Sequence, residues 1–368
     1  MQLVLRLIIS CFWFGFSIFE IVLFVKKCDT MKNNDFFSYA FALYRRRYEA
    51  EEIAYHTWYN ANRALCAFKA YCEFFLRSKD LAFDKMDMQL IQQYRQHCLF
   101  EKGNSQVTVN RKLAPIFYVL KSANMEGLAN IPSSQFQQSS LCQVTPRRYG
   151  SEADRLQRNE GGEIIRHLDD KQLKLLILYY RSLPEGPMRD SLDYFFFSFH
   201  ACGLRISDIV TLEWSQVNLA AARLQKVMVK SKSCLTIPLS EAALQILRRW
   251  RIRRPEGRFV FGLLSDYFNL EADAALSRAI DNCNRSIGRR LKTAGEQIGL
   301  PFPLGMHVAR HSFAVKALNS AQLNVHIISH LLGHSSVVVT EKVYARFLMP
   351  TLSKEVEEKL TFLEYSTE

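Results

Sequence analysis

The segment GMHVARHSFAVKAL, at residues 305–318, carries side chains that could bind an anion or move a proton. His307 and Arg310 are three residues apart, so a helix would place both on one face, and His311 comes next. An imidazole can donate or carry a proton, and a guanidinium offers paired donors in a fixed plane. A metalloprotease site is excluded, because Val308 stands where that motif needs a glutamate. Arg310 would also repel a cation, which argues against a metal site.

Two shorter segments also carry charge that could do chemistry. In CGLRISDIV, Gly203 suits a tight break, and Arg205 and Asp208 are one helical turn apart. Such a pair can hold a guanidinium in one orientation, although on spacing alone a weak surface ion pair is the better interpretation. In VKSKSCLTIPLS, Lys230 and Lys232 lie at a predicted hairpin tip. Taken alone, they are two solvated lysines.

The segment ISHLLGHSSVVVTEKVYARF contains a Gly-His pair and a tyrosine. His334 follows Gly333, and Tyr344 comes ten residues later. His326, His330 and His334 have i, i+4 spacing, which hints at metal binding. We expect Gly333 to end the helix before His334, and this argues against a metal site. A lone tyrosine is usually a core or interface residue.

The order of these segments is more specific than any one of them. Arg, Lys, His-x-x-Arg, Gly-His and Tyr follow one another as in the catalytic domain of the tyrosine recombinases, the phage-integrase family, which the chain resembles from about Leu168 to Phe347. The region before it resembles that family's helical, SAM-like core-binding domain, and NRKL at 110–113 is similar to its fourth helix. The resemblance implies a site-specific recombinase or integrase of a mobile element. It would cleave and rejoin DNA through a 3′-phosphotyrosine, without metal, ATP or any cofactor.

The same resemblance assigns roles to residues of this chain. Tyr344 would attack the phosphodiester, and Lys230 would protonate the leaving 5′ oxygen, since its distance from Pro238 fits the family's lysine better than that of Lys232. The arginines would bind the non-bridging oxygens, and the histidines would donate hydrogen bonds or help to move the tyrosine proton. The implied catalytic set is Arg205, Lys230, His307, Arg310, His334 and Tyr344, with Asp208 in a supporting role.

Composition agrees with a folded protein that binds a polyanion. The 368 residues are 48% hydrophobic and 23% charged, which excludes a disordered or fibrous chain. The formal net charge of +12 favours nucleic acid first and acidic membrane second. The nine cysteines are irregularly spaced, without a C-x-x-C pair, and indicate reduced thiols in a cytoplasmic protein rather than a disulfide framework or zinc ribbon. The resemblance to DNA recombinases implies that the protein is nucleoid-associated.

The first residues differ from the rest of the chain. Residues 3–25 are strongly apolar, although Arg6 and Glu20 interrupt them. We interpret residues 1–30 as a leader outside the fold, with Met31 as a candidate natural start. A membrane segment within residues 1–27 and a docked helix are the alternatives.

The remaining chain divides into two predicted domains, which gives a mainly α fold with a small β-hairpin. Residues 31–130 form a helical DNA-binding domain with helices over 35–47, 56–78, 88–100 and from Thr108, which could cap the last one. Pro115 predicts a kink or a late start there. Residues 131–162 form a linker, and residues 163–368 form a mixed α/β catalytic domain. In it, Val227–Val229 and Leu235–Leu239 form the hairpin, and residues 353–363 form a helical tail.

We expect the two domains to close around double-stranded DNA as a clamp, with a homotetramer assembled on recombination sites. The weaker candidates for DNA contact are basic side chains, namely Arg45, Arg46, Arg47, Arg111, Lys112 and Lys232. The alternative functions are a catalytically silent DNA-binding regulator and a type IB topoisomerase-like enzyme. A metal-dependent transposase is disfavoured, because no carboxylate cluster has a plausible spacing.

Overall fold

The computed structural model describes residues 35–130, 165–319, 323–334, 336–344 and 347. The described residues fall into two compact units, with 35–130 in unit 1 and the remainder in unit 2. The division lies between Arg147 and Arg148, within the range predicted as a linker. The predictions for residues 1–30, for the linker and for the helical tail at 353–363 lie outside the described residues.

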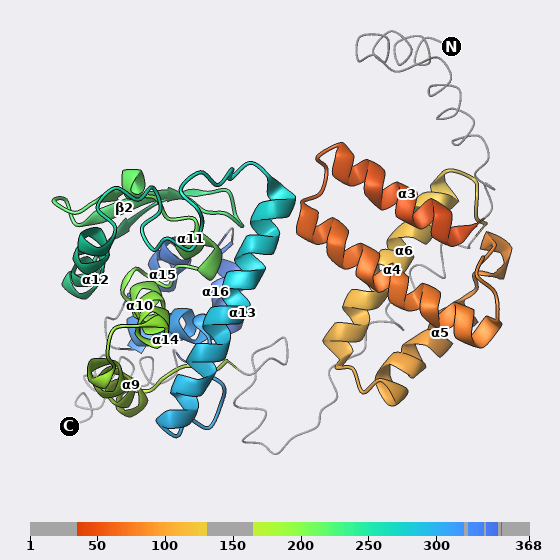
Figure 1. Ribbon diagram of the computed structural model, residues 1–368. Helices are drawn as coiled ribbons and strands as arrows, with labels where there is room; N and C mark the ends of the chain where they lie inside the picture. The colour runs from red at the N-terminus through yellow and green to blue at the C-terminus, as the bar shows by residue number, and fades with distance from the viewer. Residues whose placement is uncertain (1–34, 131–164, 320–322, 335, 345–346, 348–368) are drawn as a thin grey trace, which may run out of the picture. The chain divides into compact units, whose positions relative to one another are not determined.

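Unit 1 is helical, as the sequence predicts (Figure 1). Helix α5 (Met88–Gln96) continues directly into a π-helical turn at His97–Glu101. A short 3₁₀ turn at Phe83–Lys85 precedes α5. The observed bounds differ by only a few residues from the predicted ones. The helices are α3 (Phe36–Glu49), α4 (Tyr55–Leu76), α5 (Met88–Gln96) and α6 (Gln106–Met125).

The start of α6 differs from the prediction. Ser105 is the N-cap, because its side-chain oxygen accepts a hydrogen bond from the Thr108 amide at 3.3 Å, so the assignment of Thr108 as the cap is wrong. The helix begins at Gln106 and runs through Pro115, so a late start is wrong as well. Pro115 is buried in the unit's core, where its ring packs although it offers no amide hydrogen.

An aromatic cluster joins the helices of unit 1. The Phe68 ring of α4 is fully buried and lies 6.0 Å from Phe36, 5.7 Å from Phe37 and 4.9 Å from Tyr94, measured between ring centroids. These partners come from α3 and α5. Aromatic rings bury large apolar areas and favour such tilted and edge-on contacts. Phe68 therefore ties three helices into one core.

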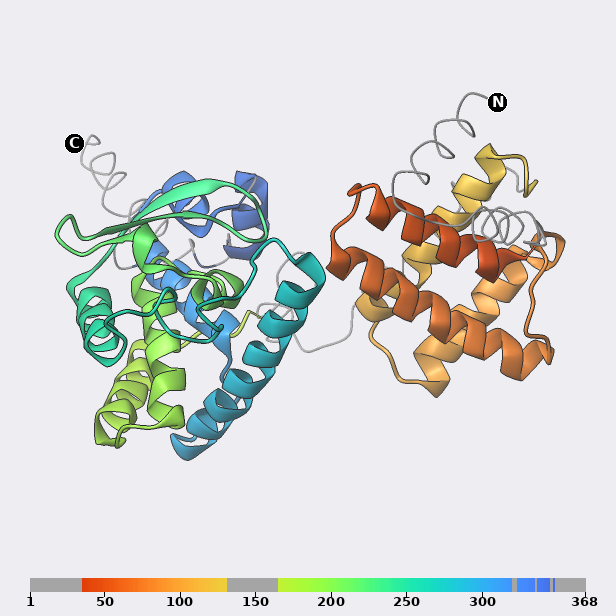
Figure 2. The same ribbon diagram turned by 45° about the horizontal axis from the view of Figure 1, so that its top comes forward.

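In unit 2, helix α10 (Pro187–His200) lies at the centre, and nine of its 14 residues are buried. It packs against α12 (Glu241–Arg253), α13 (Asp273–Gln297) and α14 (Met306–Asn319). Figures 1 and 2 both show α10 and α14 side by side. The long helix α13 runs along one side of the unit. The helices are α9 (Asp170–Ser182), α10 (Pro187–His200), α11 (Ile206–Val210), α12 (Glu241–Arg253), α13 (Asp273–Gln297), α14 (Met306–Asn319), α15 (Val325–Leu332) and α16 (Val337–Tyr344).

The sheet of unit 2 has the antiparallel order β1-β2-β3, with β1 (Val217–Asn218), β2 (Arg223–Val227) and β3 (Cys234–Pro238). The hairpin is confirmed, but its first strand ends at Val227, which pairs with Cys234, so Met228 and Val229 belong to the turn. The prediction placed this strand too late because a lysine occupies an inward position. The Lys226 side chain is 3% exposed, and its Nζ donates to the Thr211 carbonyl at 2.9 Å and to Gln216 Oε1 at 3.2 Å.

Within the described ranges, no helix is both long and apolar enough to cross a membrane. The six cysteines that these ranges include are all free thiols.

We predict that Phe68→Ala destabilises unit 1 by roughly 3–5 kcal/mol, because it removes a buried ring and leaves a cavity. Phe74→Ala is the matched control on the same helix, since the Phe74 side chain is 76% exposed. Hydrogen exchange resolved by peptide measures each unit separately. Protection should fall across unit 1 in Phe68→Ala alone, and an equal loss in unit 2 would contradict the assignment of separate cores.

Candidate active site

Arg310 is the most enclosed cation of the site. Its side chain, on α14, is 5% exposed. Nη1 donates to the Gly203 carbonyl at 2.8 Å, and Nη2 donates to the Leu332 carbonyl at 2.7 Å. Gly203 has a φ of +76°, and a Cβ there would lie 3.1 Å from the Arg310 side chain. The backbone at Gly203 therefore requires glycine both for its conformation and for its approach to Arg310.

Arg205 brings a second cation to the same carbonyl. It precedes α11, and its Nη1 donates to the Leu332 oxygen at 3.5 Å. Among the ion pairs of the described residues, neither Arg205 nor Arg310 has a carboxylate partner. Burial, followed by the charge of Arg205, lowers the pKa of Arg310 to about 10. Two neighbouring guanidiniums without an acid make a site that an anion would stabilise.

Asp208 does not pair with Arg205, so both sequence interpretations of that pair are wrong. Its side chain is fully buried, and Oδ1 accepts a hydrogen bond from the Val229 amide at 2.8 Å. Burial raises the pKa of Asp208. Val229 directly precedes Lys230, so Asp208 fastens the end of β2 and the start of its turn to α11. This contact positions a loop instead of orienting a guanidinium.

His334 lies just beyond α15, which ends at Leu332 with Gly333 in the left-handed conformation, as predicted. Its Nε2 lies 2.8 Å from Arg310 Nη2, and its Nδ1 lies 2.7 Å from the hydroxyl of Thr340. A guanidinium can only donate, so Nε2 accepts and Nδ1–H donates to Thr340. Burial, followed by the charges of Arg310, Arg205 and Lys230, lowers the pKa of His334 to about 4. A neutral His334 therefore orients Arg310.

Tyr344 ends α16 with its side chain 1% exposed. Its hydroxyl lies 2.7 Å from Nδ1 of His311, and the two ring centroids are 5.8 Å apart. Burial raises the pKa of Tyr344, and the charges of Arg310 and Arg205 oppose this. Burial also lowers the pKa of His311 to about 4, so its imidazole is neutral near pH 7.

His307 and Lys230 lie at the open side of the site. The His307 side chain is exposed at the start of α14, and its ring is 6.1 Å from that of His311. Partial desolvation, followed by the charges of Arg310, Arg205 and Lys230, lowers the pKa of His307. Lys230 is exposed in the turn after β2, and its charge acts on both His307 and His334. Lys232, also exposed in this turn, has a φ of +56°.

The basic residues singled out in unit 1 divide into two groups. Arg45 pairs with Glu49 at 2.8 Å, and Arg47 pairs with Glu52 at 3.1 Å while stacking 4.4 Å from the centroid of the Tyr118 ring. Lys112 donates to Asn104 at 3.4 Å. The remaining two are exposed, and these are Arg46 and Arg111.

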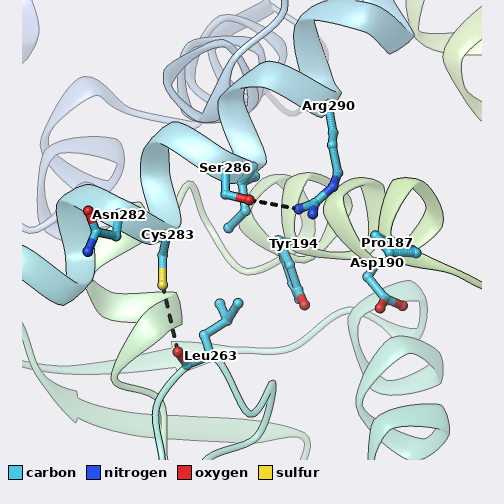
Figure 3. Close-up of a pocket in the computed structure, with 9 residues that line it drawn as sticks. Pro187, Asp190, Tyr194, Leu263, Asn282, Cys283, Ser286 and Arg290 are labelled. Atoms are coloured by element: carbon cyan, nitrogen blue, oxygen red, sulfur yellow. Dashed lines mark hydrogen bonds between the residues drawn. The ribbon is translucent and has the colours of Figure 1, made fainter.

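A pocket of about 320 Å³ lies away from these residues, between α10 and α13 (Figure 3). Its polar groups are occupied within the chain, since Arg290 donates to Ser286 at 3.1 Å and Asp190 pairs with Arg253 at 2.7 Å. None of the predicted catalytic residues lines it. In the part of the chain that the structure describes, no three His, Cys, Asp or Glu side chains are grouped to hold a metal ion.

The structure thus brings Arg205, Arg310, His334 and Tyr344 together, with His307 and Lys230 beside them. Neither His311 nor Thr340 belongs to the predicted catalytic set, although both bond directly to predicted site residues. A signal for His311 was present, because it lies one turn after His307 on the same helix face. Nothing in the spacing distinguishes Thr340.

Family models match both units. The model described as the phage integrase family covers residues 166–349, half of the chain, and the phage integrase SAM-like domain covers residues 35–138. The chain belongs to the phage integrase family. The mainly helical fold with a small sheet, expected from the resemblance, is confirmed.

Individual relatives are more distant. The chain is 31% identical over 143 residues to tyrosine recombinase XerD of Pseudomonas putida, which is 39% of this chain and 45% of that protein. It is 30% identical over 168 residues to tyrosine recombinase XerC of Ralstonia pickettii, or 42% and 49% of the two chains. The matched stretch thus spans about half the length of these relatives.

Solved integrases share the fold. The Tn1549 transposon integrase, in complex with transposon right end DNA, superimposes with a TM-score of 0.60 at 15% identity, covering 87% of this chain and 99% of that one. A lambda integrase dimer bound to a COC′ core site gives a TM-score of 0.54 at 15% identity, covering 84% and 76%.

We predict that unit 2 of this integrase-family protein loses stability as the pH falls. His311 and His334 have pKa values of about 4 in the folded chain, whereas unfolded histidines take up protons near pH 6.5. The stability that these two histidines contribute is therefore fully present above pH 6.5, falls toward pH 4, and levels off below pH 4. Each histidine contributes a slope of at most about 1.4 kcal/mol per pH unit.

Urea unfolding between pH 7 and pH 5, followed by hydrogen exchange in unit 2, measures this slope. His334→Asn should make the slope shallower, and His326→Asn, at an exposed position on α15, should leave it unchanged. An identical slope in wild type and His334→Asn would show that His334 is not held neutral.

Proposed function

We propose that this chain is a site-specific DNA recombinase that cleaves one strand by attack of Tyr344 on a phosphodiester. A bond forms between the phenol oxygen and phosphorus, and the bond from phosphorus to the 5′ oxygen breaks. The products are a 3′-phosphotyrosine and a 5′-hydroxyl, and attack by a 5′-hydroxyl of another strand reverses the step. The supporting observation is the pair of guanidiniums without an acid, Arg205 and Arg310, assembled beside Tyr344.

The geometry supports a distinct role for each cation. The transition state gathers negative charge on the non-bridging oxygens, and Arg205 and Arg310 would each stabilise it by about 3 kcal/mol, by analogy with donors in oxyanion holes. Lys230, exposed in a turn that Asp208 fixes, would protonate the leaving 5′ oxygen. His307 would donate to the phosphate. His334 would act through Arg310, because its Nε2 already accepts from that guanidinium.

We propose that both units bind duplex DNA and that a homotetramer is the assembly that recombines it. In unit 1, Arg46 and Arg111 are better candidates for phosphate contact than Arg45 and Arg47, whose charges already have partners within the chain. Phosphate contacts would make binding weaken steeply with salt.

We predict that the wild-type protein forms a covalent DNA adduct with EDTA present, and that Tyr344→Phe forms none while it still binds the DNA. The probe is a nicked duplex whose sequence Tyr344→Phe protein selects from a random pool. Denaturing electrophoresis reports the adduct. An adduct in Tyr344→Phe would remove Tyr344 as the nucleophile, and selective binding without an adduct in wild type would indicate a silent regulator. Strand exchange between two sites separates a recombinase from a topoisomerase-like enzyme.

The second prediction concerns the general acid. With DNA at saturating concentration, Lys230→Ala should slow adduct formation about 100-fold or more, because the 5′ oxygen would leave without a proton, and Lys232→Ala should slow it far less. A duplex with sulfur in place of the 5′ oxygen should restore Lys230→Ala, since a thiolate leaves without protonation. The reverse ranking of the two lysines would move the role to Lys232.

A further inference from the structure

The nucleophile proposed above is packed away from solvent. The Tyr344 ring lies in an apolar cluster with residues of α14 and α15, among them Val315, Ile328 and Leu332, and only 1% of its side chain is exposed. A DNA phosphate is part of a large polymer and cannot reach a hydroxyl buried in this way. The structure therefore shows Tyr344 in a resting position, from which it must move before it can attack.

One polar contact holds this position. In the described part of the chain, the Tyr344 hydroxyl is hydrogen-bonded to His311 Nδ1, at 2.7 Å. If Nδ1 carried the proton, the buried phenol hydrogen would lack an acceptor, which is costly. The phenol therefore donates, and His311 accepts as the neutral Nε2–H tautomer.

The surroundings keep His311 in this neutral state. Burial is the main cause of its lowered pKa, and the groups that face it add to the effect. They are His307 and Arg310 on its own helix, His334 after α15, and His167 before α9. All of these groups are cationic or become cationic on protonation, and none is an acid. His311 thus stays a hydrogen-bond acceptor throughout the physiological range.

We propose that His311 is a lock on the nucleophile, which holds the Tyr344 phenol in the resting position until DNA binding breaks the bond. His311 is thus a positioning residue whose removal speeds the covalent step. The proposal rests on the proposed function, because it assigns regulation to the same tyrosine. It concerns the free protein, however, so it also makes a prediction that needs no DNA.

The DNA experiment uses the nicked duplex described above, at saturating concentration. His311→Leu removes the acceptor with little change in volume, and it should form the adduct on the order of tenfold faster than wild type. His311→Asn offers an oxygen acceptor near the position of Nδ1 and should stay within about twofold of wild type. His326→Leu, at an exposed position of α15, is the control and should match wild type. Equal rates of adduct formation in His311→Leu and wild type would overturn the lock. Slower rates in both His311 variants would overturn it as well, because they would make the imidazole a participant in the reaction.

The second experiment measures nitration of the free protein by tetranitromethane, located by mass spectrometry. Tyr344 should be protected in wild type and His311→Asn, and it should react in His311→Leu. Tyr267, 97% exposed, is the internal reference for full reactivity, and buried Tyr194 reports whether unit 2 remains folded. If Tyr194 also reacts in His311→Leu, His311→Ala takes its place. Protection of Tyr344 in a folded variant without the acceptor would overturn the lock. If the wild-type protein forms no adduct, the proposed function is wrong. The nitration experiment would still test whether His311 holds the Tyr344 phenol in the resting position.

Discussion

The active site depends on one backbone carbonyl, that of Leu332 at the end of α15. Two guanidiniums converge on it, Arg310 at 2.7 Å and Arg205 at 3.5 Å. The carbonyl is available because α15 ends there, so no later turn of the helix supplies an amide to the Leu332 oxygen. Gly333 makes that ending possible with a φ of +63°, and any Cβ there would meet Leu235 of β3 at 2.8 Å. One helix end thus positions groups from α11, α14 and the sheet around a single point.

The hydrogen-bond acceptors that hold the two guanidiniums decide which charge the site can bind. Arg310 is held by the neutral carbonyls of Gly203 and Leu332, which fix its geometry without cancelling its charge. Asp208 is the acid closest to Arg205 in the sequence. It is fully buried, and its Oδ1 accepts a hydrogen bond from the Val229 amide. An ion pair with Asp208 would have neutralised Arg205 and weakened its attraction for a phosphate. The fold keeps two cations close together without a direct ion pair, although the charge of Asp208 acts on both of them. A phosphodiester would complete this arrangement.

The sequence alone predicted most of the helices and, through the family's ordered motifs, the residues that the structure brings together. Helical periodicity sufficed for α3 and α4, because their buried faces are continuous. It failed at β2, where Lys226 occupies an inward position and two acceptors satisfy it. The role of Asp208 could not be predicted from the sequence for a similar reason, since its partner is a backbone amide 21 positions later. Backbone amides have no signature in a sequence, so spacing alone suggested the wrong partner, Arg205.

The position of Tyr344 reflects two opposing electrostatic demands. Arg310 and Arg205 favour its phenolate, whereas burial favours the neutral phenol, and burial is the larger effect. Arrival of a phosphate would not tip this balance, because the phosphate would neutralise the same two cations that favour the phenolate. In the proposed reaction, the phenol would therefore stay neutral before it attacks, and its proton would leave as the bond to phosphorus forms. A nucleophile of this kind can rest as a neutral, hydrogen-bonded phenol at little electrostatic cost, which is the role proposed for the contact between His311 and Tyr344.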